Sequence, residues 1–166
     1  MSTGASYEHN ADHSPLPFVS DVSILGVRIA NLSTQEAIAL IARQLGEQRS
    51  ATCPIFIVNA HTLNLASESR DYQHVLNSAY RVFADGTGAR WAAHMRGVRL
   101  KANLVGTDLL PQLLHSTARR GYRLFLLGAD PVTVGLAADR CQRVFPGWTV
   151  AGYHHGYIRE ERETAR

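Results

Sequence analysis

The stretch that decides the fold class is YRLFLLGADP, residues 122–131. Residues 122–127 form an apolar run typical of a buried strand, and the polar turn 128–131 interrupts it. A helix is predicted over 132–145, followed by a Pro146-Gly147 turn and a last strand over 148–153. A strand, a helix and a second strand in this order predict a βαβ unit with parallel strands and a right-handed crossover.

The preceding half of the chain also alternates strands with helices. Ser33 and Glu36 form an S-x-x-E capping box before a helical pattern, and the apolar run 54–60 has the length and composition of a strand buried on both faces. The remaining predictions are a strand over 22–27, a helix over 62–69, a helix capped by Asp71, a strand over 81–84, a helix over 89–95, and a helix over 109–120 with Thr107 as N-cap and Gly121 as its stop. This alternation predicts an α/β fold with a mostly parallel sheet covered by helices.

Length and composition indicate one soluble domain over residues 18–166. The 166 residues are 45% hydrophobic and 19% charged, and no apolar run approaches the roughly 20 residues of a membrane-spanning helix. Residues 1–17 are polar, without the features of a secretory signal, and are expected to form a disordered leader. Cys53 and Cys141 lack metal or disulfide spacing, so buried thiols in a reducing cytoplasm are expected.

The net charge is only +3, but positive residues cluster in the middle of the chain. Such a cluster suits nucleotide phosphates or an anionic membrane surface, and equally a solvated face. The arginines are not interleaved with aromatic residues as in nucleic-acid-binding modules, so no nucleic-acid partner is predicted. The histidines lack metal-ligand spacing, and no metal site is predicted. The basic residues are Arg90, Arg96, Arg99, Lys101, Arg119, Arg120 and Arg123.

Polar clusters follow three of the predicted strands, where ligands bind in open α/β sheets. Asp85 in the segment 85–88 is either a general base or a tight-turn residue chosen for its local hydrogen bonds. Asn59 in the segment 59–62 either binds a sugar hydroxyl or caps the next helix. Gly128 precedes a helix N-terminus that could attract phosphate, although a lone glycine is not a dinucleotide or P-loop motif.

Six segments together carry a family resemblance. They are GVRI at 26–29, VNAH at 58–61, FADGTG at 83–88, VGTDL at 105–109, LFLLG at 124–128 and HGY at 155–157. In this order they resemble WecG/TagA/CpsF glycosyltransferases, and the resemblance covers residues 22–158. It implies a Rossmann-like enzyme that transfers a sugar from a UDP-sugar to a polyprenyl-diphosphate-linked saccharide, with inversion and without a metal or other cofactor.

The resemblance also implies roles for individual residues. Asp85 falls on the family's catalytic base, which takes the proton of the attacking hydroxyl. Two positions depart from the common pattern, Ile57 in place of Thr and Asn103 in place of Arg; Asn103 occurs in a branch that suggests a xanthan-type exopolysaccharide enzyme. Substrate contacts are expected from Asn59, His61, Thr62, Gly86, Thr87, Asn103, Thr107 and Asp108, and nucleotide contacts from Gly128, Ala129 and Asp130.

Family members continue beyond the HGY segment, so the chain is expected to be truncated at its C-terminus, with an uncovered sheet edge that favours self-association. The implied partners are a UDP-sugar, a lipid-linked acceptor and the inner face of the cytoplasmic membrane, where the protein would bind peripherally. The alternative is a non-catalytic remnant that binds a nucleotide sugar or another protein, which Ile57 and Asn103 favour.

Overall fold

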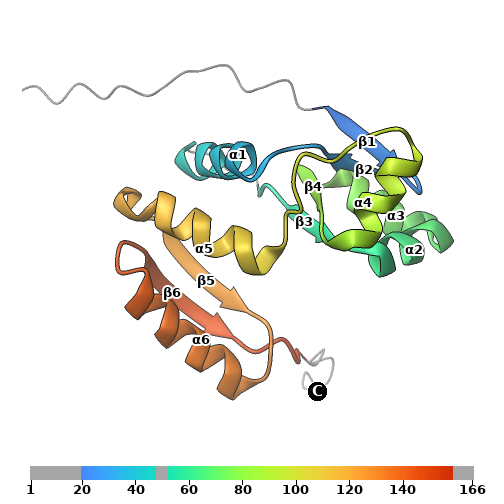
Figure 1. The fold of residues 1–166 in the computed structure, drawn as a ribbon. Coiled ribbons are helices and arrows are strands. Elements are labelled where there is room, and N and C mark those ends of the chain that lie inside the picture. Colours follow the sequence, from blue (N-terminus) through green and yellow to red (C-terminus); the bar gives the residue numbers. More distant parts are fainter. Residues whose placement is uncertain (1–19, 48–51, 159–166) are drawn as a thin grey trace, which may run out of the picture.

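A computed structural model describes residues 20–47 and 52–158 (Figure 1). The predicted leader, residues 1–17, lies outside these ranges. Within them, no helix combines the length and the hydropathy that crossing a membrane requires.

The first element is an antiparallel hairpin. Strand β1 (Asp21–Ile24) pairs with β2 (Val27–Ala30), so the prediction of one strand over 22–27 is wrong. The chain reverses at Leu25 and Gly26, which both have positive φ angles, 48° and 82°. Leucine rarely adopts that conformation, and its presence hid the turn from sequence reasoning. The Gln73 side chain holds the turn by donating a hydrogen bond of 2.9 Å to the Leu25 carbonyl oxygen.

Helix α1 (Thr34–Gly46) begins as its capping box predicts. The Ser33 hydroxyl accepts from the Glu36 N–H at 3.3 Å, and the Glu36 carboxylate accepts from the Ser33 N–H at 2.7 Å. The ammonium group of Lys101 also lies 2.9 Å from this carboxylate. These interactions, the Lys101 hydrogen bond foremost, lower the pKa of Glu36 to about 2.

A parallel strand pair follows. In β3 (Ile55–Val58) and β4 (Arg81–Ala84), Val58 pairs with Ala84, and the connection contains α2 (Ala60–Glu68) and α3 (Arg70–Ser78). The expectation that the first of these strands is buried on both faces is wrong, because Ile57 is 40% exposed. Ser69, rather than Asp71, caps α3 with its hydroxyl, which accepts from the Tyr72 N–H.

Helix α4 (Gly86–Met95) begins directly after β4, so the expected polar turn at 85–88 is the N-terminal part of a helix. Helix α5 (Gly106–Ser116) and the 3-10 turn η1 (Ala118–Arg120) come next. Val105 occupies the N-cap position of α5, so the assignment of Thr107 as N-cap is wrong. Gly121 ends this region with φ 65°, the left-handed conformation expected of a helix stop.

The predicted βαβ unit is confirmed. Strands β5 (Arg123–Leu127) and β6 (Thr149–His154) are parallel, and α6 (Pro131–Val144) connects them. Trp148 joins the unit to the rest of the chain, since its indole N–H donates to the Leu114 carbonyl oxygen in α5 at 3.1 Å. Its ring also packs edge-on against Tyr122.

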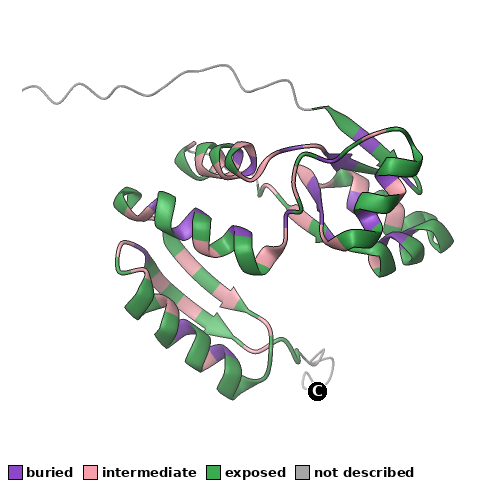
Figure 2. Ribbon diagram, in the orientation of Figure 1, coloured by how far each residue is buried: buried purple, intermediate pink, exposed green. Residues whose placement is uncertain are grey.

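The fold is α/β with short parallel sheets, in agreement with the Rossmann-like class. The strands form three separate pairs, of which β3–β4 and β5–β6 are parallel. Buried residues concentrate around β1, β2, β4 and the helices beside them, whereas the β5–α6–β6 unit is mostly exposed (Figure 2). Cys53 and Cys141 are half-buried free thiols, less enclosed than expected. Most of the predicted substrate residues therefore lie on the well-packed part of the molecule.

Candidate functional site

Asp85 and Asn59 lie at the carboxyl end of the β3–β4 pair. Each follows directly after a paired residue, Ala84 and Val58, and the Asp85 N–H donates to the Val58 carbonyl oxygen at 2.8 Å. Neighbouring strands are about 4.8 Å apart, so the two residues are adjacent across the edge of the sheet. The structure thus brings together two predicted site residues that are far apart in the sequence.

The Asp85 carboxylate has no partner among the residues that the structure describes. It makes no capping hydrogen bond at the start of α4, and no other hydrogen bond or ion pair joins it to the described residues. The Gly86 N–H donates to the side-chain oxygen of Asn103 at 2.7 Å. A turn-forming or capping aspartate accepts from the N–H groups two and three residues further on, here those of Thr87 and Gly88, and the Asp85 carboxylate accepts from neither. The turn-residue interpretation of Asp85 therefore loses its physical basis, and the carboxylate remains available to a ligand.

Asn103 reaches this position because its segment runs beside β4. The N–H of Leu104 donates to the Ala84 carbonyl oxygen at 3.1 Å, on the side of β4 opposite the Val58 contact. Asp85 therefore lies between Asn59 and Asn103. The same segment leads into α5, whose first turn contains the exposed residues Thr107 and Asp108.

Asn59 acts as a helix cap, the second of its two interpretations. Its side-chain oxygen accepts from the Thr62 N–H at 3.0 Å and from the Thr62 hydroxyl at 3.2 Å. The side-chain NH₂ of Asn59 makes no hydrogen bond within the described residues and can still donate to a ligand. His61 is exposed in the same first helical turn.

Two glycines allow α4 to start close to α2. Gly86 has φ +85°, a conformation that side chains rarely adopt. A Cβ on Gly88 would lie 2.7 Å from the Cβ of Ala60 in α2, so only glycine permits this approach. The D-G-x-G segment is thus a device that brings two helix N-termini together around Asp85.

The predicted nucleotide residues lie at the carboxyl end of β5. The N–H of Gly128 donates to the His154 carbonyl oxygen at 3.0 Å, and the Gly156 N–H donates to that of Ala129 at 2.9 Å. Gly156, from the HGY segment, packs against Gly128 so closely that an added Cβ would lie 3.0 Å from the Gly128 Cα atom. The segments 128–130 and 155–157 therefore form one structure.

Asp130 caps α6 with its own carboxylate. One oxygen accepts from the N–H groups of Val132 and Thr133, each at 3.0 Å, and the other accepts from the Thr133 hydroxyl. These hydrogen bonds, led by the Thr133 hydroxyl, lower the pKa of Asp130. A charged carboxylate already occupies the first turn of α6, which leaves Gly128 and Ala129 as the better-placed residues for a phosphate.

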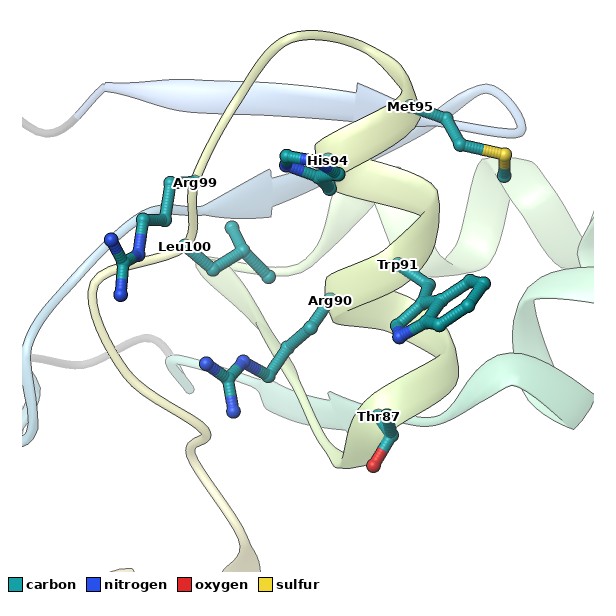
Figure 3. Close-up of a pocket in the computed structure, with 7 residues that line it drawn as sticks. All are labelled: Thr87, Arg90, Trp91, His94, Met95, Arg99 and Leu100. Carbon is teal, nitrogen blue, oxygen red and sulfur yellow. The ribbon is translucent and has the colours of Figure 1, made fainter.

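A groove on the exposed side of α4 was absent from the predicted site. It encloses about 680 Å³ and starts at Thr87, two residues after Asp85 (Figure 3). Of its lining residues, the sequence indicated only Thr87, as a substrate contact, and Arg90 and Arg99, as part of the basic cluster, because the groove depends on how α4 and the following loop fold together. We call it the α4 groove, lined by Thr87, Arg90, Trp91, His94, Met95, Arg99 and Leu100. No group of three or more metal-ligating side chains occurs in residues 20–47 and 52–158.

Comparison with known families shows which family the chain belongs to. A model of the glycosyl transferase WecG/TagA/CpsF family matches residues 22–166. The chain belongs to this family. The matched region contains Asp85, Asn59, Asn103 and the 128–130 loop, so every predicted site residue lies within the family domain.

Curated relatives in two bacteria share the family domain. An N-acetylglucosaminyldiphosphoundecaprenol N-acetyl-β-D-mannosaminyltransferase of Bacillus spizizenii is 33% identical over 60% of the chain and 39% of its own length. A protein of the same name from Staphylococcus aureus is 31% identical over 86% of the chain and 56% of its own length. The chain therefore spans about half the length of the curated relatives that it matches.

Proposed function

We propose that this family member is a glycosyltransferase that moves a sugar from a UDP-sugar to a polyprenyl-diphosphate-linked saccharide. The observation that carries the proposal is the free carboxylate of Asp85 at the carboxyl end of β4. Two of the relatives are named for transfer onto a lipid-linked acceptor, N-acetylglucosaminyldiphosphoundecaprenol. Because such an acceptor is held in a membrane, we also propose that the protein works at the inner face of the cytoplasmic membrane.

In the proposed reaction, Asp85 acts as the general base. A hydroxyl of the acceptor saccharide attacks the anomeric carbon of the donor while the carboxylate takes its proton. The new glycosidic bond forms as the bond to the diphosphate breaks, and UDP leaves with that pair of electrons. Attack from the face opposite UDP inverts the anomeric configuration.

Other residues at the same edge would position the substrates. The free NH₂ of Asn59 and the exposed side chains of Thr107 and Asp108 can hydrogen-bond sugar hydroxyls. Asn103 would hold the Asp85-Gly86 peptide in place through its hydrogen bond to the Gly86 N–H. The backbone of Gly128 and Ala129, which lies at the carboxyl end of β5, would contact the nucleotide.

Replacement of Asp85 by asparagine tests the proposal. Asparagine is nearly isosteric, and the Asp85 side chain makes no hydrogen bond to the described part of the chain that the change could break, so Asp85→Asn should fold normally. Loss of a general base lowers the rate about 10²–10⁴-fold. The measurement is transfer of radiolabelled sugar to a lipid-linked acceptor by the full-length protein, with and without the substitution. If the variant transfers sugar at a rate within a few-fold of the unmutated protein, the role of Asp85 is refuted. If the unmutated protein itself transfers no sugar, the non-catalytic alternative is favoured.

A further inference from the structure

The α4 groove combines positive charge with apolar surface. Arg90 and Arg99 lie on one side of α4, and Trp91 and Met95 on the other (Figure 3). Trp91 is 70% exposed and Met95 is 78% exposed, although both are large apolar side chains. The groove therefore offers a charged part and an apolar part to the same ligand.

The groove lining contains positive but no acidic side chains. Arg90 and Arg99 are the positive residues of the lining, and Asp85 and Asp108 flank the segment 86–107 in the sequence. Lys101 is neutralised by Glu36. The guanidinium groups of Arg90 and Arg99 make no hydrogen bond or ion pair with the described residues. Arginine pairs well with phosphate oxygens because its planar N–H groups can donate two hydrogen bonds at once.

The apolar side extends beyond the groove. A second hollow of about 290 Å³ adjoins α4 and shares Met95 with the first. Its lining includes Ile24, Leu25, Leu63 and Ala92, so apolar surface continues from Trp91 through Met95 toward the β1–β2 turn. A flexible hydrocarbon chain could follow this path and gain stabilisation from burial along its length.

The groove lies at a suitable separation from Asp85. Helix α4 starts next to Asp85, and its rise of 1.5 Å per residue places Arg90 about 7.5 Å and Met95 about 15 Å along the helix axis from it. A ligand that extends along α4 from Asp85 would therefore meet first Thr87, then Arg90 on one side of the helix and Trp91 on the other, and Met95 farther along.

We propose that the α4 groove binds the prenyl diphosphate part of the lipid-linked acceptor. Arg90 and Arg99 bind the diphosphate, Trp91 and Met95 contact the first isoprenyl units, and the saccharide points back to Asp85. The inference rests on the proposed function and assigns the acceptor's place in that site. A prenyl diphosphate matches a groove with positive side chains on one side of α4 and apolar side chains on the other, and it fits a hollow of limited volume better than the flat surface of a bilayer does.

Tryptophan fluorescence of the unmodified chain tests this proposal without requiring transfer activity. The chain has two tryptophans, and Trp148 is only 4% exposed, so a change in solvent exposure reports Trp91. Farnesyl diphosphate should shift the emission to shorter wavelength in a saturable way, and Trp91→Phe should abolish the shift. Inorganic pyrophosphate or farnesol alone should bind at least about tenfold more weakly, because each offers only part of the contacts.

Matched charge variants locate the diphosphate. Arg90→Gln and Arg99→Gln should each weaken farnesyl diphosphate binding about tenfold or more, whereas Arg120→Gln, an exposed arginine on η1, should leave it unchanged. Equal melting temperatures would exclude misfolding as the cause. Absence of a shift with farnesyl diphosphate, or equal effects of all three substitutions, would overturn the proposal.

Two further comparisons distinguish prenyl diphosphate binding from docking on a bilayer and from the catalytic role of Asp85. Phosphatidylglycerol vesicles without prenyl diphosphate should give a smaller shift than the same vesicles containing it, and an equal shift would mean that the groove docks on the bilayer instead. Asp85→Asn should keep the Trp91 shift while losing transfer. If farnesyl diphosphate gives no Trp91 shift but Asp85→Asn still abolishes transfer, the groove assignment is refuted and the proposed function is not.

Discussion

Asp85 and Asn59 occupy equivalent positions after neighbouring strands, yet their side chains act differently. Asn59 uses its oxygen to cap α2, whereas the Asp85 carboxylate caps nothing. Beside Asp85, the Gly86 N–H donates to the side-chain oxygen of Asn103, which holds the backbone at the start of α4. A carboxylate without a capping hydrogen bond, next to an asparagine whose side chain is hydrogen-bonded, is the arrangement expected of a general base beside a group that positions the substrate.

Replacement of Asn103 by alanine tests this arrangement. Asn103→Ala removes the partner of the Gly86 N–H, and we expect the free energy of unfolding to fall by about 1 kcal/mol. The turnover rate should fall more than the affinity for either substrate, because Asp85 is displaced while the binding surfaces remain. Urea unfolding and steady-state kinetics measure the two effects. Gln35→Ala, at an exposed amide side chain in α1, is the control and should change neither the free energy of unfolding nor the turnover rate; equal behaviour of the two variants would contradict the role of Asn103.

Among the individual elements, helix α6 is capped by a charged side chain, that of Asp130. The Asp130 carboxylate accepts hydrogen bonds from the first turn of α6 and has a lowered pKa in the folded chain. A carboxyl group whose pKa is lowered by folding stabilises the protein above its unfolded pKa, and that contribution is lost as the pH falls through the folded pKa. The helix should therefore be most firmly anchored near neutral pH.

A pH series on Asp130→Asn measures this contribution. Asparagine also caps helices well but does not ionise, so the variant should lose less stability than the unmutated chain as the pH is lowered from 7 to below the ordinary aspartate value of 3.8. Melting temperatures across the series provide the comparison. Parallel curves for the two proteins would show that the Asp130 charge does not contribute.

At the scale of the whole molecule, a close contact joins the β5–α6–β6 unit to the remainder. A Cβ added to Gly147 would overlap the carbonyl group of Ala118, and the neighbouring residue Trp148 donates a hydrogen bond to Leu114. Phe125 and Leu127 in β5 are exposed. The expected self-association of the chain stays a prediction, and these exposed side chains are consistent with it.

A pair of glycine substitutions tests the close contact between Gly147 and Ala118. Gly147→Ala should lower the free energy of unfolding by about 1–3 kcal/mol, since the added methyl group must push Ala118 and its backbone away. Gly135→Ala, inside α6, meets only ordinary contacts with Tyr153 and should raise stability by up to about 1 kcal/mol. Chemical denaturation gives both values, and destabilisation of the two variants to the same extent would contradict the close contact at Gly147.

Local patterns in the sequence were sufficient for several elements. The apolar run 122–127, the helix after it and the last strand predicted the β5–α6–β6 unit to within one or two residues, and the capping box predicted the start of α1. The strand Arg81–Ala84 and the polar segment after it placed Asp85 at a strand end. The ordered motifs also identified the family. These features succeed because strand and helix preferences act over a few neighbouring residues.

Other features depend on residues that meet only in the folded chain. The β1–β2 turn contains a leucine with positive φ, which Gln73 holds from 48 positions away. The side-chain oxygen of Asn103 accepts from the Gly86 N–H across 17 positions, and this contact holds the backbone next to Asp85. The α4 groove likewise requires α4 and the loop to Leu100 to pack together. Sequence determined which chemical groups stand at the strand ends; the tertiary structure decided which of them are already hydrogen-bonded and which can act, because that depends on long-range contacts that local patterns do not encode.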